Sequence, residues 1–464
     1  MRPPARPFRW FTLLFGLLLV GYMFFSKSFA YLTRIPGTPV FAGEVVLAVG
    51  LIEAVRARSV IRLLLKASPS LRVLLALMAF TGIRLLWDLP TYGMDAIRDY
   101  SIFYYGSIAF LVAAAAMSDQ SFIPRLLRWY RRILPWFLLW VPIAIFLARH
   151  QALATTYIPG STTPINTFKG SDLVIMTTMA LVFLWLGLDH ITERRLTRRL
   201  DDLLTVLGVF ALLVLISQSR VALLVILAVF GTMLWFLPNS RRRRFVLATV
   251  GSIVIVLVPV LLLNLQLQLG GRHLSLQQVK DNVASIFSRN AQSDEAETGL
   301  QGTVKWRQEL FGTILDNSLS SDRILTGRGF GPILSYDYLR QPPAPDAPPP
   351  LRSAHNSHLT VLARTGLPCF GLWVLLWVMW FRHMSRVARP ARHGVRNPAS
   401  LAVWLLTGVV GLLVVSFDDP TLETPQGAIW LWTMVGLAIA HTLMASQRAV
   451  EPGSERHADE FVLK

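Results

Sequence analysis

The sequence contains almost no cysteine: Cys369 is the one cysteine among 464 residues. This scarcity excludes a disulfide framework and any cysteine-based zinc site. Charged residues are also few, at 16%, whereas hydrophobic residues make up 53% and the mean hydropathy is +0.49. A typical soluble domain is about 25% charged. The composition therefore predicts a polytopic membrane protein whose fold is shaped by the surrounding lipid.

Acidic residues are in deficit, since 27 Asp and Glu stand against 45 Lys and Arg and leave a net charge of +18. Such an excess is also found in proteins that bind nucleic acid. Here, however, the basic residues fall in short runs between apolar segments and do not gather on one soluble face. They are typical of topology signals in a membrane protein, and we expect no nucleic-acid partner.

Long apolar runs are abundant. A helix needs about 20 residues to cross the hydrocarbon core of a bilayer, and by this measure the chain has twelve candidate spans, which predicts an all-α fold. The first span lacks a small-residue cleavage site and is followed by others, so we expect it to be a retained anchor. The predicted spans cover residues 9–26, 39–55, 71–87, 99–117, 133–149, 172–188, 203–217, 221–237, 245–266, 358–381, 401–417 and 426–445.

Lys and Arg are concentrated in every second loop between these spans, as expected of cytoplasmic loops. One missed span would move every later basic run to the opposite side, so the alternation supports the count of twelve. It predicts that both termini are cytoplasmic. The basic runs are Arg2, Arg6 and Arg9; Arg56, Arg58, Arg62, Lys66 and Arg72; Arg125, Arg128, Arg131 and Arg132; Arg194, Arg195, Arg198 and Arg199; Arg241 to Arg244; and Arg382, Arg386, Arg389, Arg392 and Arg396.

The spans divide the chain into four expected segments. Residues 1–266 hold spans one to nine, residues 267–356 form one long outer loop with short helices, residues 357–445 hold spans ten to twelve, and residues 446–464 are a cytoplasmic tail. The outer loop contains an amphipathic stretch, with Val304, Leu310, Phe311 and Ile314 on one helical face, and a proline-rich run, RQPPAPDAPPP, expected to be polyproline II or disordered. A loop this long is usually functional.

Two arginines on the outer side carry possible chemistry. Arg220, in LISQSRVALL, follows a three-residue turn between two apolar runs; snorkelling to headgroups is an equally good interpretation of this stretch alone. Arg307 lies on the amphipathic stretch of the outer loop, where a solvated helix face is the commoner role. If either arginine has a functional partner, that partner is anionic.

The outer loop ends with further polar residues. Arg328 stands among Gly327, Gly329 and Gly331, a spacing that admits backbone amides close to a phosphate but usually forms only a turn. At the mouth of the tenth span lie His355, Asn356 and His358, which could also be ordinary interface residues. Arg220, Arg307 and His355 come from distant parts of the chain and are all predicted on one side of the membrane.

These motifs resemble those of the bacterial O-antigen ligase family and related lipid-linked polysaccharide polymerases, from Leu203 to Phe417. The shared features are the SxSR turn, an arginine four residues before an aromatic, the GRGFG pattern, and a histidine–asparagine pair with a glycine ten residues after the asparagine. In this sequence they fall at Ser217 to Arg220, Arg307 and Phe311, Gly327 to Gly331, and His355, Asn356 and Gly366. The family usually has tryptophan at the position of Phe311 and a small or hydroxylated residue at that of Cys369.

The resemblance implies a GT-C-like glycosyltransferase of the bacterial inner membrane with a periplasmic active site. It would move a glycan from undecaprenyl diphosphate to an acceptor hydroxyl on lipid A core or on a growing glycan. Arg220 and Arg307 would clamp the leaving diphosphate in place of a metal, and His355 would be the general base, its pKa lowered by neighbouring arginines. Arg328, Asn356 and His358 are further candidate substrate-binding residues. No cofactor and no metal are expected.

Three alternatives stay open. Asp418, in the outer stretch FDDPTLETP, is a second candidate base. With Asp419 and Glu423 it could also form a metal or sugar site, although this stretch is more typical of a polar turn. The enzyme could be a polymerase, or could transfer the glycan to protein, because the family pattern does not separate these acceptors. A transporter or flippase for the same lipid-linked sugar stays possible because the predicted spans contain the charged residues Glu44, Arg84 and Arg364. The absence of two matching halves in the sequence counts against it.

Overall fold

The computed structural model describes residues 8–35, 38, 40–148, 153, 156–158, 164–165, 168–188, 198–218, 220–262, 267–269, 272–274, 300–320, 322–337, 352–393 and 399–450. The predicted proline-rich run, the basic residues Arg2, Arg6, Arg194, Arg195 and Arg396, and residues 451–464 of the predicted tail lie outside this description.

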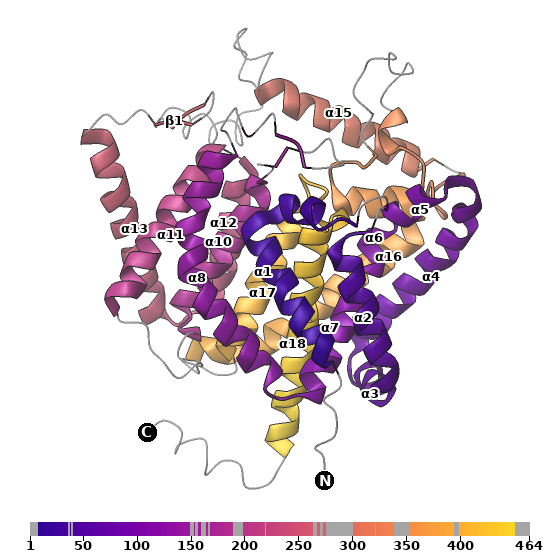
Figure 1. Ribbon diagram of the computed structural model, residues 1–464, viewed down its shortest axis with the longest axis horizontal. Coiled ribbons are helices and arrows are strands. Elements are labelled where there is room, and N and C mark those ends of the chain that lie inside the picture. Colours follow the sequence, from indigo (N-terminus) through magenta and orange to yellow (C-terminus); the bar gives the residue numbers. More distant parts are fainter. Residues whose placement is uncertain are drawn as a thin grey trace.

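Within the described residues the fold is helical except for one short antiparallel ribbon (Figure 1). The helices are α1 (Arg9–Leu32), α2 (Ala42–Arg56), α3 (Arg58–Ala67), α4 (Pro69–Tyr92), α5 (Met94–Asp99), α6 (Ser101–Tyr104), α7 (Ser107–Ser118), α8 (Phe122–Leu147), α10 (Gly170–Trp185), α11 (Arg198–Gln218), α12 (Arg220–Phe236), α13 (Asn239–Leu262), α15 (Leu300–Ser318), η2 (Leu334–Asp337), α16 (Ser357–Ala388), η3 (Arg389–His393), α17 (Ala399–Val415), η4 (Thr421–Glu423) and α18 (Pro425–Val450). The ribbon pairs β1 (Leu267–Leu269) with β2 (Arg272–Leu274).

Several of these helices have the length and apolar composition of membrane spans. In the described part of the chain six qualify: Arg9–Leu32, Pro69–Tyr92, Ser101–Ser118, Phe122–Leu147, Ser357–His393 and Pro425–Gln447. Three shorter apolar helices accompany them, Gly170–Trp185, Val221–Phe236 and Ala399–Val415. The protein is thus an all-helical, polytopic membrane protein. Each of the twelve predicted spans overlaps a helix; that all twelve cross the bilayer stays a prediction.

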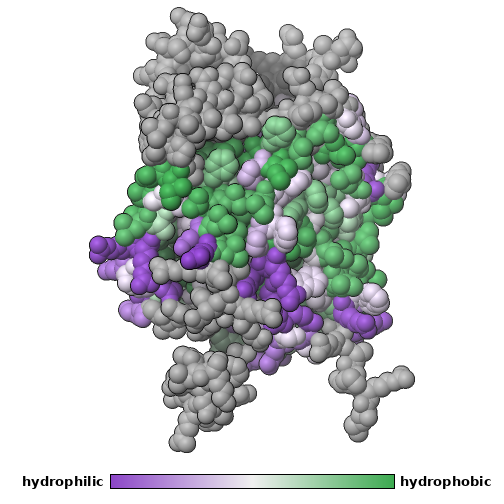
Figure 2. Space-filling view, turned by 60° about the vertical axis from the view of Figure 1, so that its left-hand side comes forward, coloured by the Kyte–Doolittle hydropathy of each residue, from purple (hydrophilic) through white to green (hydrophobic). Residues whose placement is uncertain are grey.

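The outer surface of the bundle matches a lipid environment. Figure 2 shows a hydrophobic belt across one side of the molecule, with hydrophilic residues gathered along its lower edge. On α4, Phe80, Leu86 and Trp87 are 59%, 70% and 82% exposed. Large apolar side chains this exposed are unusual on a soluble protein, whereas in a bilayer they contact lipid tails.

The centre of the bundle is formed by α17 and α18, which pack on α12 and α7 respectively and on each other. Nearly every residue of α17 is buried. Small residues permit close approach: a Cβ added at Gly436 in α18 would lie 2.6 Å from the carbonyl oxygen of Ala109 in α7, and one at Gly408 in α17 would lie 2.8 Å from Met179. Small residues at helix contacts are how membrane helices gain dispersion contacts without a hydrophobic driving force.

The α15 helix lies across the upper end of the bundle in Figure 1, opposite the end at which α18 terminates. Leu310 and Ile314 of α15 are buried against Leu334, Ala354 and Ala363, as the predicted apolar face of the outer loop requires. The end of α12 meets η3, the short helix after α16, where Arg392 donates from Nε to the carbonyl oxygen of Trp235 at 2.7 Å. The helix α3, in contrast, was not predicted and occupies a stretch interpreted only as a basic loop.

The three span charges that kept the transport alternative open have partners. The Glu44 carboxylate of α2 accepts hydrogen bonds from the Tyr104 hydroxyl at 2.9 Å and from the Tyr105 hydroxyl. Arg84 pairs with Asp88 one turn away on α4 at 2.9 Å, and Arg364 of α16 pairs with Asp99 of α5 at 2.9 Å. These contacts satisfy the charges within the protein, which gives no support to a polar path for a transported sugar.

Candidate functional site

Four helix ends converge beside α15. The helices α10, α12 and α16 begin here and α17 ends here, and α17 packs against all three. The start of α16 is tied to the end of α17 because the Ser357 amide donates to the Ser416 carbonyl at 2.8 Å and the Ser357 hydroxyl donates to the Asp419 carbonyl at 3.3 Å. Three helix N-termini at one place favour an anionic ligand.

Two ion pairs cross this junction. Arg307 of α15 pairs through Nη1 with the Asp418 carboxylate, and Lys169, directly before α10, pairs with the Asp419 carboxylate. The Ser171 hydroxyl donates to Asp419 at 2.9 Å. All four ion-pairing side chains are at most about one third exposed, so the pairs are partly buried where α15 meets the bundle. We call Lys169, Arg307, His355, Asp418 and Asp419 the outer cluster.

His355 lies close enough to both ion pairs to feel their charges. Its backbone conformation is unusual. Its φ of 53° is in the left-handed region, which costs a non-glycine residue on the order of 1–3 kcal/mol and is concentrated at functional positions. Burial lowers the pKa of His355 below its ordinary value of 6.5, with Arg307 and Lys169 acting in the same direction and Asp419 and Asp418 opposing them. The neutral imidazole, which can accept a proton, is therefore favoured. The direction agrees with the expectation from sequence, but burial is a larger cause than the arginines.

Asn356 and His358 have structural partners. The Asn356 side chain caps α16 by accepting the Leu359 amide at 3.0 Å. His358 is held on both ring nitrogens, with Nε2 at 3.0 Å from the Leu413 carbonyl and Nδ1 accepting the Trp373 indole at 3.2 Å. Both residues therefore fix the start of α16 beneath His355. Substrate contact by either of them stays a prediction.

The glycine pattern around Arg328 is a docked turn. Gly327, Gly329 and Gly331 all have positive φ, at 64°, 81° and 114°. The amides of Arg328 and Gly329 donate to carbonyls of α16 at 2.8 and 2.9 Å. Those of Phe330 and Gly331 donate to the carboxylates of Asp88 and Asp99 at 2.7 and 2.8 Å. These amides thus bind protein groups in place of a phosphate, and the role of the Arg328 side chain stays a prediction.

Arg220 is placed by its backbone alone, since its side chain lies outside the described residues. It is the first residue of α12. The helices α12 and α17 run antiparallel and approach most closely where a Cβ on Gly411 would lie 2.9 Å from Cγ2 of Val229, with Cγ1 of Val225 at 3.7 Å. From these contacts α12 runs back toward Arg220 as α17 runs on toward Ser416. The start of α12 and the end of α17 therefore lie at the same end of the bundle, and contact between the Arg220 side chain and the outer cluster stays a prediction.

The sequence interpretation missed one member of the outer cluster. Lys169 was not considered, although a lone lysine at the outer mouth of a span was a usable signal. Asp419 was considered as part of a metal or sugar site, with a polar turn as the commoner interpretation. Glu423, in the same stretch as Asp419, is partly buried: burial raises its pKa from 4.5 to about 7, with the positive charge of Arg364 opposing this. It lies in η4, in the connection between α17 and α18. Among the described residues, no group of three or more His, Cys, Asp or Glu is arranged to hold a metal ion.

One comparison with known proteins bears on this site. Residues 204–374 match the family model described as O-antigen ligase, which confirms the resemblance found in the motifs. No curated protein matches the chain. The matched segment contains Arg220, Arg307, Arg328, His355, Asn356 and His358, whereas Lys169, Asp418 and Asp419 lie on either side of it.

Proposed function

Residues 204–374 of this chain belong to the O-antigen ligase family, and from this premise we propose that the protein is an inner-membrane glycosyltransferase. It moves a glycan from undecaprenyl diphosphate to an acceptor hydroxyl on the periplasmic face, as a ligase acting on lipid A core. The observation that carries the proposal is the outer cluster, in which a half-buried histidine with a lowered pKa shares one site with an arginine and a lysine.

The donor is held through its diphosphate. As the bond between the anomeric carbon and the phosphate oxygen breaks, negative charge grows on the departing lipid diphosphate. Preorganised guanidinium groups stabilise that charge, and arginine presents two parallel N–H donors to phosphate oxygens. Arg307 is the described candidate, and Arg220 joins it from the start of α12. In the absence of donor, Asp418 holds Arg307 in place.

The acceptor is activated by His355. Its neutral imidazole takes the proton of the acceptor hydroxyl while that oxygen forms a bond to the anomeric carbon, and the lipid diphosphate leaves with the bonding electrons. Because burial lowers the pKa of His355, the ring is in its accepting form near neutral pH. Asp419 offsets part of this effect and stabilises the imidazolium once it forms.

The transport alternative has less support. A path for a polar sugar requires charges that face a cavity within the spans. Glu44 and Arg364 instead bind groups on neighbouring elements, and Arg84 pairs with Asp88 within α4. The polymerase alternative shares the same chemistry and differs only in the acceptor, which makes it an outcome of the assay below.

The test is transfer by the purified, reconstituted protein supplied with a polyprenyl-diphosphate-linked glycan. Lipid A core and a second lipid-linked glycan are offered in separate reactions. His355→Ala should reduce the rate roughly 10²–10⁴-fold, the usual contribution of a general base. His393→Ala is the matched control, because His393 is an exposed histidine in η3 at the opposite end of the bundle.

Transfer to lipid A core that is lost in the His355 variant and kept in the His393 variant supports the ligase. Transfer to the second lipid-linked glycan alone identifies a polymerase. Unchanged turnover in His355→Ala removes this residue as the base. Movement of the donor across the bilayer without transfer to any acceptor would favour the flippase.

A further inference from the structure

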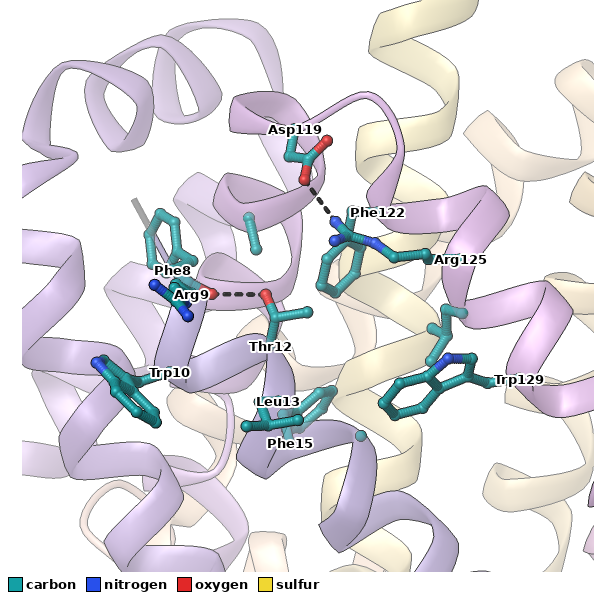
Figure 3. A pocket seen from close by; sticks show the side chains of 13 residues that line it. Phe8, Arg9, Trp10, Thr12, Leu13, Phe15, Asp119, Phe122, Arg125 and Trp129 are labelled. Atoms are coloured by element: carbon teal, nitrogen blue, oxygen red, sulfur yellow. Dashed lines mark hydrogen bonds and ion pairs between the residues drawn. The ribbon is translucent and has the colours of Figure 1, made fainter. Parts of the chain in front are cut away.

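A second polar pocket lies at the end of the bundle away from the outer cluster. It opens between the start of α1, the end of α7 and the start of α8, and has a volume of about 490 Å³. Its charged lining consists of Arg9, Arg125 and Asp119, two positive charges against one negative charge. Figure 3 shows Arg9 and Arg125 entering from opposite sides, with the rings of Trp10 and Trp129 beside them.

Arg125 is only partly satisfied by protein groups. Its Nη2 pairs with the Asp119 carboxylate, but its Nε is buried without a hydrogen-bond partner in the described part of the chain. Across the pocket, the Arg9 guanidinium stands 5.8 Å over the ring of Trp10. An anion between the two arginines would neutralise the excess positive charge of the lining.

The pocket opens on the outer surface of the bundle, where Trp10 is 59% and Leu13 is 45% exposed. Tryptophan and arginine together are typical of headgroup depth in a membrane. The first amides of α1 do not face an anion here, because Trp10 and Phe11 donate to the Glu53 carboxylate at 3.3 and 3.1 Å. Side chains therefore form the recognition surface.

A small apolar cavity adjoins this pocket along the bundle. It has a volume of about 30 Å³ and shares Gly16, Leu126 and Trp129 with the larger pocket, and its lining is otherwise almost wholly apolar, including Val20, Met23 and Ile133. Gly16 lets the Trp129 ring approach α1 closely, since a Cβ there would come within 2.6 Å of that ring. The larger pocket has room for a phosphate headgroup, whereas the small cavity is too narrow for an acyl chain, so the chains of a bound lipid would lie along the exposed apolar side chains at the rim.

We propose that the pocket between α1, α7 and α8 binds an anionic phospholipid of the surrounding membrane, with its phosphate between Arg9 and Arg125 and its acyl chains along the exposed apolar side chains of Trp10 and Leu13. The lipid fastens the start of α1 to α8. This site is independent of the proposed glycan transfer.

The test uses the full-length chain in mild detergent and native mass spectrometry. The probes are phosphatidylglycerol and phosphatidylcholine with identical acyl chains. Arg9→Gln changes an exposed side chain at a helix start, so folding is preserved, and it should weaken phosphatidylglycerol binding roughly fivefold and leave phosphatidylcholine binding unchanged. Asp119→Asn combined with Arg125→Gln removes the second arginine without leaving an unpaired carboxylate and should have an effect of similar size.

Arg132→Gln is the matched control, since it removes the same charge from an exposed position of α8 outside the pocket. Tighter binding of phosphatidylglycerol that depends on Arg9 and Arg125 but not on Arg132 supports the site. Equal binding of the two lipids, or equal effects of the Arg9 and Arg132 variants, overturns it in favour of diffuse surface attraction. Displacement of phosphatidylglycerol by a lower concentration of undecaprenyl phosphate overturns the choice of occupant and assigns the pocket to the polyprenyl carrier.

Discussion

Replacement of Arg364 by Met should detach the glycine turn at Gly327 to Gly331 from the bundle. Arg364 is 1% exposed. Its Nη1 donates to the carbonyls of Gly329 and Pro332 at 3.2 and 3.3 Å, and its Nη2 donates to the Arg352 carbonyl at 3.1 Å and pairs with Asp99 at 2.9 Å. This one guanidinium therefore joins the turn, the segment before His355 and α5.

The size of the effect follows from these contacts. Methionine keeps much of the side-chain volume but leaves three carbonyls without their arginine donor and Asp99 without one of its two cationic partners. Removal of one member of a buried ion pair costs about 3–5 kcal/mol. Arg352 still pairs with Asp99 at 3.1 Å, so we expect the lower end, about 3 kcal/mol. Opening of the turn would then become roughly a hundredfold more frequent.

Amide hydrogen exchange of the detergent-solubilised protein measures this opening directly. The reporting amides are those of Phe330 and Gly331, which donate to the carboxylates of Asp88 and Asp99. Arg323→Met is the matched control, because Arg323 is 41% exposed and its carboxylate partner lies 3.8 Å away. Such a surface pair contributes about 0–1 kcal/mol, and exchange of the turn should be unchanged.

A second variant separates the lost hydrogen bonds from the orphaned charge. Asp99→Asn added to Arg364→Met removes the carboxylate that has lost a partner, so part of the protection should return. The reasoning is refuted if Arg364→Met and Arg323→Met give the same exchange rates at the turn, because Arg364 would then not hold it.

Three further predictions concern the outer cluster and its surroundings. Asp419 raises the pKa of His355 against the effect of burial. Asp419→Asn should therefore move the acid limb of the pH profile of kcat/KM for glycan transfer to lower pH. A limb that stays in place or moves to higher pH contradicts the assignment of His355 as the general base. Asp418→Asn releases Arg307 from its ion pair and should lower the KM for the donor with kcat nearly unchanged, whereas a collapse of kcat would identify Asp418 as the base. Burial raises the pKa of Glu423 from 4.5 to about 7. Between these two pH values the folded protein retains a proton that the unfolded chain releases. The free energy of unfolding therefore falls by about 3 kcal/mol as the pH rises from 4.5 to about 7. Glu423→Gln should therefore flatten the fall in Tm between pH 5 and pH 8, and an unaltered fall would show that another group titrates.

The arrangement of helices was largely predictable because hydrophobicity alone determines which segments enter a bilayer. Each predicted span overlaps a helix, and the amphipathic stretch of the outer loop forms α15 with Leu310 and Ile314 buried. The helix α3 was missed because the alternation of basic loops was used only to orient the spans. Its Arg58, Arg62 and Lys66 recur every four residues opposite the buried Leu64, a helical period that the same residues already displayed.

The partners within the site were less predictable. The motifs indicated Arg307 and His355, but nothing local in the sequence pairs Lys169 with Asp419, which lie 250 residues apart. Those contacts depend on how α10 and α17 pack. The same applies to His358, whose ring is held by Leu413 and Trp373, and to the glycine turn, whose amides find carboxylates on α4 and α5. Composition and motif order identify such residues, whereas tertiary packing decides their roles.

The central claim is that Arg220, Arg307 and His355 act on one lipid-linked diphosphate beside α15. The most direct measurement is an electron cryomicroscopy structure of the full-length protein with undecaprenyl diphosphate bound. The account predicts diphosphate oxygens at about 3 Å, ordinary hydrogen-bond distance, from the guanidinium groups of both Arg220 and Arg307, with the His355 ring facing the side from which an acceptor hydroxyl approaches. A diphosphate bound at the opposite end of the bundle, or out of reach of both arginines, would contradict it.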